Sequence, residues 1–502
     1  MKKCSEDFAK RNSWIFAGMA AVILTAAFLF LRKEGILLPS WACWQNRQIQ
    51  TGEEGPGTII LENRRVTVSK QGEILWQSPD ECRVQDVLWC DIDRDQEMEM
   101  ILLCWRVGTY GKARPFWVEE KDNEKEWSQH IDIYDWRANE NRMAPIWMAS
   151  DIGVDAVKWA YDDTRRYLLI QERDGDVSGW AWLQWGLESI ETSVSFAAVG
   201  DNLLHEAIYR EGLARGSFDF LYEHVKQEIQ AADVAVINQE TPLVDEPGMY
   251  GGYPSFGTPS EVADAIAAAG FDVLTCATNH ALDRGILGVD MTVSACESRR
   301  IMCLGIQSSK QTEYEPYQLL ERRGIRFALL NYTDILNGQA MPKENAYAVH
   351  TLQEETVRCD LKRARTDADV VMVFVHWGTE YEAEPDEQQQ KWMNLFLEQG
   401  VDVVIGTHPH VIQPWELLKG EDGREMLVYY SLGNFVSAQD RSETMLGGIA
   451  RFTATLTLDG VKITDYGMES LVMHQEAGQY SVYFQKDYTE ELAKRHRLAL
   501  DM

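Results

Sequence analysis

The sequence predicts an α/β domain preceded by a small all-β domain and an N-terminal transmembrane helix. Three observations support this prediction. Residues 14–31 form an uncharged, apolar run near the N-terminus. Fourteen of the 17 tryptophans lie before residue 190, which indicates two separately built domains. After residue 192, nearly continuous apolar runs alternate with helical patterns, as in a sheet that helices cover on both faces.

The apolar run at 14–31, WIFAGMAAVILTAAFLFL, is near the short end of the roughly 17–25 residues that a spanning helix needs. Basic residues flank it, with a modest bias that favours an internal N-terminus. They are Lys2, Lys3, Lys10, Arg11, Arg32 and Lys33. A cleaved signal peptide is the alternative, although no clear small-x-small site follows the run. We therefore expect a cytoplasmic stub and anchor at 1–33, a linker at 34–54, and the bulk of a single-pass membrane protein outside the cytoplasm.

The region 55–191 is expected to be a Trp-rich β domain, because its apolar runs are short and rich in aromatic and β-branched residues. The expected strands lie at 58–69, 84–92, 99–107, 155–161, 167–174 and 180–185. A weak repeat, offset by about 70 residues, relates Trp76–Ser78 to Trp147–Ser150. This pattern indicates two or three propeller-blade-like sheets, whereas a complete propeller needs more chain.

One turn in this domain carries alternating carboxylates, at Asp91, Asp93, Asp95 and Glu99. Oxygen ligands spaced in this way can surround a hard cation. The pattern resembles the DxDxDGxxE loops of integrin-type propeller repeats, which implies a calcium site. Gln96 stands where those loops have glycine, and a solvated acidic turn is the alternative interpretation.

The α/β domain is expected at 192–475, closed by a β-hairpin from Gly447, with a polar tail at 476–502. Polar residues follow its predicted strands, at the carboxyl ends where open α/β sheets bind ligands. They are Asp201, Asn202, Asn238, Glu240, Asn279, His280, His376, His408, His410 and Asn434. Each of these residues alone is weak evidence for a metal site, since an acid after a strand is often a helix N-cap. Together they suit one or two divalent metals (Mn, Fe or Zn) that activate water for phosphoester hydrolysis.

The net charge of -31 argues against a nucleic-acid partner, which would require clustered Lys and Arg. Metal ions at the strand ends would locally offset this charge. The nine cysteines show no CxxC spacing, so a zinc–thiolate site is not expected. Most are interpreted as small buried hydrophobes.

In order and combination, the strand-end motifs resemble the CapA, or poly-gamma-glutamate capsule, family of the calcineurin-like metallophosphatase superfamily. The resemblance covers about residues 194–437. Its motifs are Gly200-Asp201, Asn238-x-Glu240-x-Pro242-Leu243, Asn279-His280-Ala281-x-Asp283-x-Gly285, His376-Trp377-Gly378-x-Glu380-Tyr381, Gly406-Thr407-His408-Pro409-His410-Val411 and Ser431-Leu432-Gly433-Asn434-Phe435. It implies a metallophosphatase-like αββα sandwich in a bacterial cell-surface protein.

The resemblance also implies residue roles. The expected metal ligands are Asp201 and His410 for one ion, bridging Glu240, and Asn279, His376 and His408 for the second. His280 would act as general acid or as an electrostatic aid to the leaving group, and Asp283 would orient it. The residues expected to contact substrate or support the ligands are Asn202, Asn238, Glu380 and Asn434. Leu203 stands where the superfamily usually has a histidine ligand, so His205 is a candidate substitute, and Glu240 replaces the usual Asp.

Two functions follow from the resemblance. The first is a metal-dependent hydrolase of phosphoester-like bonds that acts in making, exporting or attaching an anionic polymer, such as poly-gamma-glutamate, with polymer-synthase subunits as partners. The alternative is a non-catalytic module that binds polymer or assembles a synthesis complex. The altered first motif and the Trp-rich β domain favour this alternative.

Overall fold

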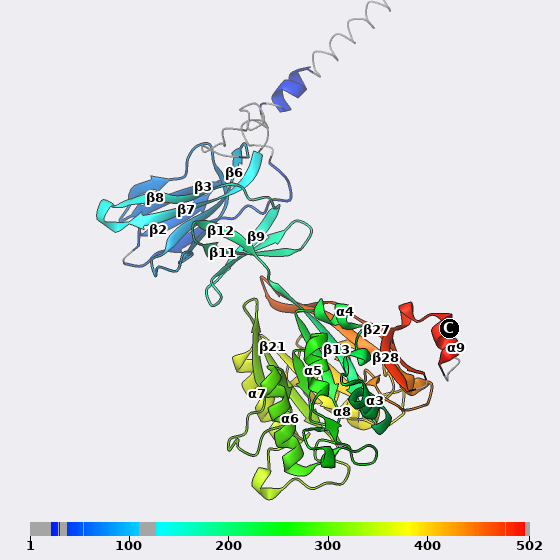
Figure 1. Ribbon diagram of the computed structural model, residues 1–502. Coiled ribbons are helices and arrows are strands. Elements are labelled where there is room, and N and C mark those ends of the chain that lie inside the picture. The colour runs from blue at the N-terminus through cyan, green and yellow to red at the C-terminus, as the bar shows by residue number, and fades with distance from the viewer. Residues whose placement is uncertain are drawn as a thin grey trace, which may run out of the picture. The chain divides into compact units, whose positions relative to one another are not determined.

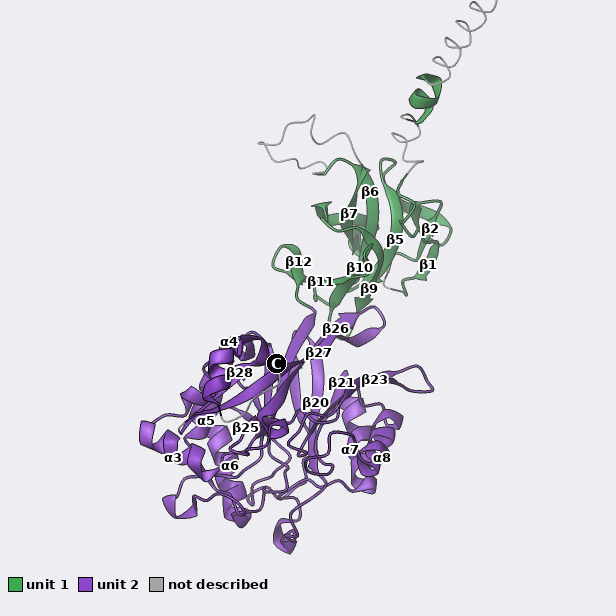
Figure 2. Cartoon of the chain, turned by 90° about the vertical axis from the view of Figure 1, so that its right-hand side faces the viewer, with its two compact units in different colours: residues 1–191 green, residues 192–502 purple. Residues whose placement is uncertain are grey.

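The chain divides into two compact units, residues 1–191 and 192–502 (Figure 1; Figure 2). The structure, a computed structural model, describes residues 22–28, 30, 38–53, 55–109, 127–476 and 478–496. Of the predicted anchor at 14–31, residues 22–28 and 30 are helical and the remainder lies outside the described residues. Within the described ranges, no helix has both the length and the apolarity required to cross a membrane.

The described part of the first unit forms three four-stranded antiparallel sheets, in each of which consecutive strands are neighbours. The first sheet contains β1 (Arg47–Gln50), β2 (Thr58–Glu62), β3 (Arg65–Lys70) and β4 (Glu73–Gln77). The second contains β5 (Arg83–Cys90), β6 (Glu99–Val107), β7 (Trp127–Arg137) and β8 (Arg142–Asp151). The third contains β9 (Ala156–Asp162), β10 (Tyr167–Glu172), β11 (Val177–Leu183) and β12 (Gly186–Ile190). The prediction of small antiparallel sheets before the α/β domain is therefore confirmed.

Two hydrophobic clusters join these sheets. One cluster packs the first sheet against the second, through residues such as Val68 and Leu102, and the other packs the second against the third, through residues such as Ile101 and Ile170. The sequence repeat now has a structural meaning, because Trp76 and Trp147 lie in the last strands of successive sheets. The prediction of a linker at 34–54 is wrong in part, since β1 pairs with β2 along its whole length.

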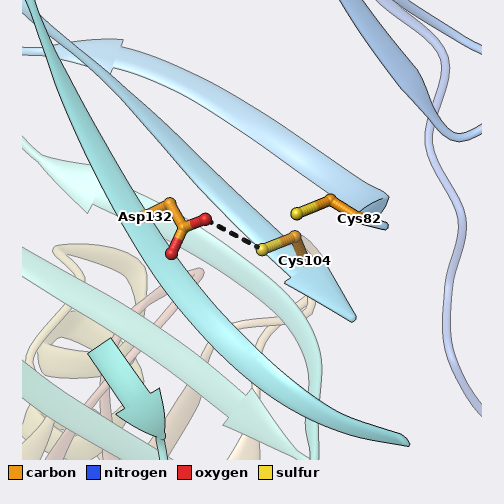
Figure 3. Close-up of side chains that lie close together, drawn as sticks. All are labelled: Cys82, Cys104 and Asp132. Atoms are coloured by element: carbon orange, nitrogen blue, oxygen red, sulfur yellow. Dashed lines mark hydrogen bonds between the residues drawn. The ribbon is translucent and has the colours of Figure 1, made fainter. Parts of the chain in front are cut away.

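Two cysteines lie deep in the first unit beside Asp132 (Figure 3). Cys104 Sγ donates a hydrogen bond to Asp132 Oδ2 over 3.6 Å, and Arg106 donates to the same oxygen over 2.9 Å. The contact with Cys82, together with burial, raises the pKa of the Cys104 thiol well above its usual value. A neutral thiol behaves as a small apolar side chain, in agreement with the sequence-based interpretation.

The described part of the second unit contains two large mixed sheets and a small two-stranded parallel sheet of β15 (Leu243–Val244) and β16 (Thr258–Pro259). The larger has the strand order β18-β17-β14-β13-β26-β27-β28, with β25 also paired to β13, and the smaller has the order β19-β20-β21-β22-β24-β23. The larger sheet is formed by β13 (Ser193–Asn202), β14 (Val234–Gln239), β17 (Val273–Thr275), β18 (Met302–Leu304), β25 (Asn434–Val436), β26 (Leu446–Thr457), β27 (Gly460–Glu476) and β28 (Gln479–Phe484). The smaller is formed by β19 (Gln318–Arg322), β20 (Ile325–Thr333), β21 (Val370–His376), β22 (Val403–Thr407), β23 (Trp415–Lys419) and β24 (Glu425–Tyr429).

These sheets pack face to face, with helices on their outer faces (Figure 2). Phe196 of β13 meets Phe327 of β20 with ring centroids 5.0 Å apart. The larger sheet is covered by α3 (Glu206–Arg215), α4 (Lys226–Gln230), α5 (Val262–Ala269) and α6 (Gly285–Arg299), and the smaller by α7 (Glu354–Asp367) and α8 (Glu387–Glu398). Because both faces of each sheet are covered, central strands such as β14 and β21 are buried at every position.

The C-terminal region differs from the predicted polar tail at 476–502. β28 pairs with β27 over six residue pairs, and a short helix, α9 (Glu490–Arg495), follows it. β28 is an edge strand, half-exposed, so its sequence lacks the apolar run that marks a central strand. The predicted hairpin from Gly447 is present as β26 and β27.

A capping box starts α8, which packs behind the site-bearing strands. Asp386 accepts a hydrogen bond from the Gln389 N–H over 2.9 Å, and the Gln389 side chain accepts one from the Asp386 N–H. We expect Asp386→Ala to lower the free energy of unfolding by about 1 kcal/mol, measured by urea denaturation. Asp386→Asn, which keeps a capping oxygen, should retain most of that stability, and an equal loss in both variants would contradict the capping role.

Candidate metal centre

The candidate ligands come together where strands from both sheets end. Asp201 lies at the end of β13, Glu240 directly follows β14, and His376 ends β21. His408 and His410 follow β22, and Asn279 lies beyond β17. All six side chains are buried, with exposed fractions of 0–3%. Residues more than 200 positions apart therefore share one enclosed cluster.

Lone pairs face each other across this cluster. His376 Nε2 lies 3.0 Å from Asn279 Oδ1 and 3.2 Å from His408 Nδ1. Its single hydrogen, where present, can satisfy only one of these two acceptors. Burial lowers the pKa of His408 to about 3 and that of His376 well below its usual value, so both imidazoles stay neutral. Neutral imidazole is the form that binds metals.

The surroundings of the Glu240 carboxylate show whether a metal would fit the cluster. Both of its carboxylate oxygens are buried and have no hydrogen-bond partner among the described residues. Burial raises the pKa of Glu240 well above its usual value, and Asp201 adds to the effect, while His410 opposes it. A buried carboxylate without donors is destabilising unless a proton or a cation binds it. Glu240 Oε1 lies 3.9 Å from His376 Nε2 and 3.8 Å from His410 Nε2, so one cation could contact all three side chains.

His410 is the charged member of the cluster. Burial alone would lower its pKa, but the nearby carboxylates of Glu240 and Asp201 raise it to about 9. Its Nδ1 lies 3.2 Å from Asp201 Oδ2. Glu240, His408 and His410 each offer a ligand atom within 4.8 Å of the others. The donor set of carboxylate oxygens, imidazole nitrogens and an amide oxygen fits one or two divalent transition metals.

The backbone of the two histidines after β22 is left-handed. His408 has φ 99° and His410 has φ 60°, both unusual for residues other than glycine. The His408 N–H donates to Asp201 Oδ2 over 3.3 Å, which ties this strained turn to β13. Strained residues of this kind gather at functional sites, where surrounding contacts hold them in place.

Neighbouring polar side chains orient the ligands. Asn238 Nδ2 donates to Asp201 Oδ1 over 2.8 Å, and Thr407 Oγ1 lies 3.0 Å from His376 Nδ1. Asn434 Oδ1 lies 3.1 Å from His410 Nδ1. Such contacts fix the orientation and the proton position of ligating rings. Thr407 was not predicted from the sequence, although it lies inside the Gly-Thr-His-Pro-His motif.

His280 and Asp283 form a separate pair. His280 Nδ1 lies 2.7 Å from Asp283 Oδ2, and Asp283 also accepts hydrogen bonds from the Phe256 N–H and from Gln339 Nε2. This arrangement leaves His280 Nε2 available for another partner. Gln339, in an irregular segment without a motif, gave no signal in the sequence.

Two residues expected at the site, Asn202 and His205, are placed differently. Asn202 uses its amide to bond Gln239 and Tyr222, because it points to the opposite face of β13 from Asp201. His205 Nδ1 accepts the Ala438 N–H over 3.2 Å, and burial lowers the pKa of this ring to about 4. It is not one of the ligand atoms grouped around Glu240. Glu380 is exposed.

Beside Glu380, Tyr381 also takes a left-handed conformation, with φ 69°. Its ring lies 6.0 Å from that of His410, and the Arg441 guanidinium stacks on it at 4.2 Å. This exposed cation close to the ligand cluster was not predicted from the sequence, because residues 439–443 follow no motif.

The acidic turn of the first unit is also compact. Asp91, Asp93 and Glu99 bring carboxylate oxygens within 4.8 Å of one another. Asp95 instead accepts the Glu97 N–H over 2.8 Å, and so stabilises the turn. Gln96 adopts φ 75°, the conformation that glycine takes most easily, so its side chain does not prevent the turn. Burial, followed by the neighbouring carboxylates of Asp93 and Asp95, raises the pKa of Glu99 to about 8.

Residues 195–439 match the family model described as "Bacterial capsule synthesis protein PGA_cap". The chain is 26% identical over 261 residues to "PGA biosynthesis protein CapA" of Bacillus subtilis (strain 168), covering 52% of this chain and 67% of that protein. It is 26% identical over 268 residues to "Capsule biosynthesis protein CapA" of Bacillus anthracis, covering 52% and 63%. The alignments thus span about two thirds of these relatives. Among solved structures, a Staphylococcus aureus protein assigned as a 5′-nucleotidase, in complex with α-ketoglutarate, matches with a TM-score of 0.38 and 14% identity, covering 55% of this chain and 54% of that one.

Proposed function

Because residues 195–439 form a domain of the PGA_cap capsule-synthesis family, distantly homologous to CapA proteins, we propose that this protein is a metal-dependent hydrolase of phosphoester-like bonds. Its role would lie in the synthesis, export or attachment of an anionic capsule polymer of the poly-gamma-glutamate type. The observation that carries the proposal is the fully buried Glu240 carboxylate, which has no hydrogen-bond partner among the described residues and shares its cluster with the neutral imidazoles of His376 and His408.

The proposed ligands are Asp201, Glu240, Asn279, His376, His408 and His410. When bound, a divalent metal would supply Lewis acidity toward a phosphoryl oxygen and lower the pKa of water. Residues of the chain would donate the proton and orient the ligands. His280 Nε2 would donate a proton to the leaving group, while Asp283 holds Nδ1 and stabilises the charged imidazole. Asn238 keeps Asp201 turned toward the cluster.

An anionic substrate must approach a protein whose net charge is -31. The metal and the exposed Arg441, stacked on Tyr381 beside His410, would supply the local positive charge. A guanidinium can bind both phosphate and carboxylate groups by bidentate hydrogen bonds. We further propose that residues 14–31 anchor the protein in the cell membrane, with both units outside the cytoplasm and near polymer-synthase subunits.

His280→Asn tests the proposal in the full-length protein loaded with Mn, Zn or Fe. The variant should lower kcat on generic phosphomonoesters or phosphodiesters by about 10²–10⁴-fold, the usual contribution of a general acid. Its metal content, measured by elemental analysis, should equal that of the wild type. Asp283→Asn should lower kcat by a smaller factor.

His224→Asn serves as the matched control, because His224 is an exposed histidine that pairs with Glu223 on the surface. It should leave turnover unchanged. A wild type that binds metal but turns over no phosphoester would contradict hydrolysis and favour the polymer-binding module.

A further inference from the structure

A cavity lies at one edge of the second unit, between β18 of the larger mixed sheet and β20 of the smaller one. Its volume is about 290 Å³, close to the lower limit of about 300 Å³ for small-molecule sites. Among the described residues that line it, none is a candidate metal ligand, so the cavity is separate from the metal centre. Part of its wall is apolar and is formed by Val293, Ile301, Leu304, Ile306 and Leu329.

The buried part of the cavity holds His350, whose side-chain tautomer is fixed by a neighbour. Gln307, which also lines the cavity, donates from Nε2 to the Glu313 carbonyl over 2.9 Å. The Gln307 Oε1 atom is therefore the one that lies 3.1 Å from His350 Nε2. Because an amide oxygen can only accept, His350 Nε2 carries the hydrogen of the ring.

His350 Nδ1 is consequently an acceptor with a free lone pair. Burial lowers the pKa of His350 to about 4, so the ring is neutral near neutral pH. His350 is 5% exposed, and its Nδ1 is buried without a hydrogen-bond partner among the described residues. The other two buried polar side chains of the wall have partners, since Asn331 Oδ1 accepts the Cys276 N–H and Gln307 bonds as above. A ligand that donates to Nδ1 would relieve the cost of this unsatisfied acceptor.

The exposed rim of the cavity is acidic. Glu297 and Glu315 line it and are exposed, whereas no Lys or Arg is among the described residues of its lining. The Glu315 N–H donates to Gln307 Oε1 over 3.1 Å, which holds this part of the rim against the buried end. A cationic group at the rim would be attracted by these carboxylates, and an anionic group would be repelled.

We propose that this cavity binds a small amine that has an apolar body and, at its other end, a neutral hydrogen-bond donor such as a hydroxyl group. The hydroxyl would donate to His350 Nδ1, the body would pack on the apolar wall, and the ammonium would stay at the rim beside Glu297 and Glu315. The hydroxyl, rather than the ammonium, suits the buried end, because burying a charge is much more costly than burying a hydroxyl that is hydrogen-bonded.

Tyramine is the probe that tests this proposal, because it combines a phenol hydroxyl, an aromatic body and an ammonium group. It is titrated into the full-length protein after EDTA treatment, so that no metal binds the amine, and its binding is followed by ligand-observed NMR. Saturable binding is expected, with a Kd of about 1 mM or lower for a ligand of this size. Phenethylamine, which lacks the hydroxyl, should bind about tenfold more weakly, because His350 Nδ1 then has no donor. The analogue 3-(4-hydroxyphenyl)propionate, which carries a carboxylate in place of the ammonium, should also bind more weakly than tyramine.

Two variants test the location of the site. Val293→Phe places a larger side chain in the wall and should abolish saturable binding of tyramine. Ser294→Phe is the matched control, because Ser294 is exposed on the same helix and lies outside the lining, so this variant should bind like the wild type. Glu315→Gln should weaken tyramine binding by about two- to fivefold, as expected for an exposed ion pair.

Thermal unfolding shows whether Val293→Phe is folded. If it is not, the comparison of tyramine with phenethylamine in the wild type, together with Glu315→Gln, decides the question. The proposal is overturned if tyramine shows no saturable binding, if phenethylamine or the carboxylate analogue binds as tightly, if folded Val293→Phe or Glu315→Gln binds like the wild type, or if Ser294→Phe abolishes binding as well.

Discussion

Replacing Glu240 by glutamine is expected to strip the second unit of its metal and of any hydrolytic activity. Both Glu240 oxygens are buried and have no hydrogen-bond partner among the described residues. The substitution removes the charge that a metal would neutralise but keeps the size of the side chain. The metal affinity should fall by more than the roughly 10–100-fold that accompanies loss of a residue that only supports a ligand. Asp201 also lies near both His376 and His410, but unlike Glu240 it accepts hydrogen bonds, from Asn238 Nδ2 and from the His408 N–H.

Elemental analysis and thermal unfolding measure this effect together. At a free metal concentration about 100 times Kd, the wild type should gain about 2.7 kcal/mol from the metal, and Glu240→Gln should gain almost none. Glu382→Gln, an exposed acid close in sequence to the site, should behave like the wild type. Retention of metal and of the metal-dependent Tm rise in Glu240→Gln would refute the assignment of this centre.

Gly200→Ala is expected to destabilise the second unit severely. A Cβ at this position would lie 1.9 Å from the backbone oxygen of Gly433, a contact that no rotamer change can relieve. The same oxygen accepts the Asp201 N–H over 3.0 Å, so the clash would also displace a candidate ligand. Overpacking usually costs about 1–3 kcal/mol, and a backbone clash belongs at the upper end of that range.

Calorimetric unfolding should show a fall in Tm of about 6 °C or more, at about 2 °C per kcal/mol for a large domain. Gly467→Ala is the matched control, because Gly467 lies in β27, has an ordinary φ, and would place its Cβ in open space. It should unfold close to the wild-type temperature. Equal Tm values for Gly200→Ala and Gly467→Ala would contradict this prediction, because they would mean that β13 and β25 can move apart without a loss of thermal stability.

The strand-end rule predicted most of the residues that the structure brings together. Asp201, Glu240 and His376 come from three buried strands whose ends meet, and this depends only on strand order and direction, which the apolar runs reveal. Their roles as metal ligands stay a prediction. The rule could not separate Asp201 from Asn202, because neighbouring residues of a strand point to opposite faces and the motif does not say which face bears the site.

Other differences arise from contacts between distant parts of the chain. His205 accepts a hydrogen bond from the backbone N–H of Ala438, 233 residues away, and no local sequence pattern predicts that contact. The edge strands β1 and β28 were assigned to a linker and a tail, because each is partly exposed and lacks a strong apolar signal. The Trp repeat, in contrast, did predict more than one small sheet, because its two copies lie in the last strands of successive antiparallel sheets.

The contact of Gly200 with Gly433 has a counterpart at Gly406, where a Cβ would lie 1.9 Å from the Tyr430 backbone oxygen. The spacing of the ligand-bearing strand ends is therefore set by main-chain atoms, which substitutions do not alter. During evolution, single substitutions could replace the ligand side chains of the cluster one at a time. They could not easily change the distance between the strand ends that carry those side chains. A side chain that is longer by one methylene, as Glu240 is relative to aspartate, is a change that this fixed backbone still permits.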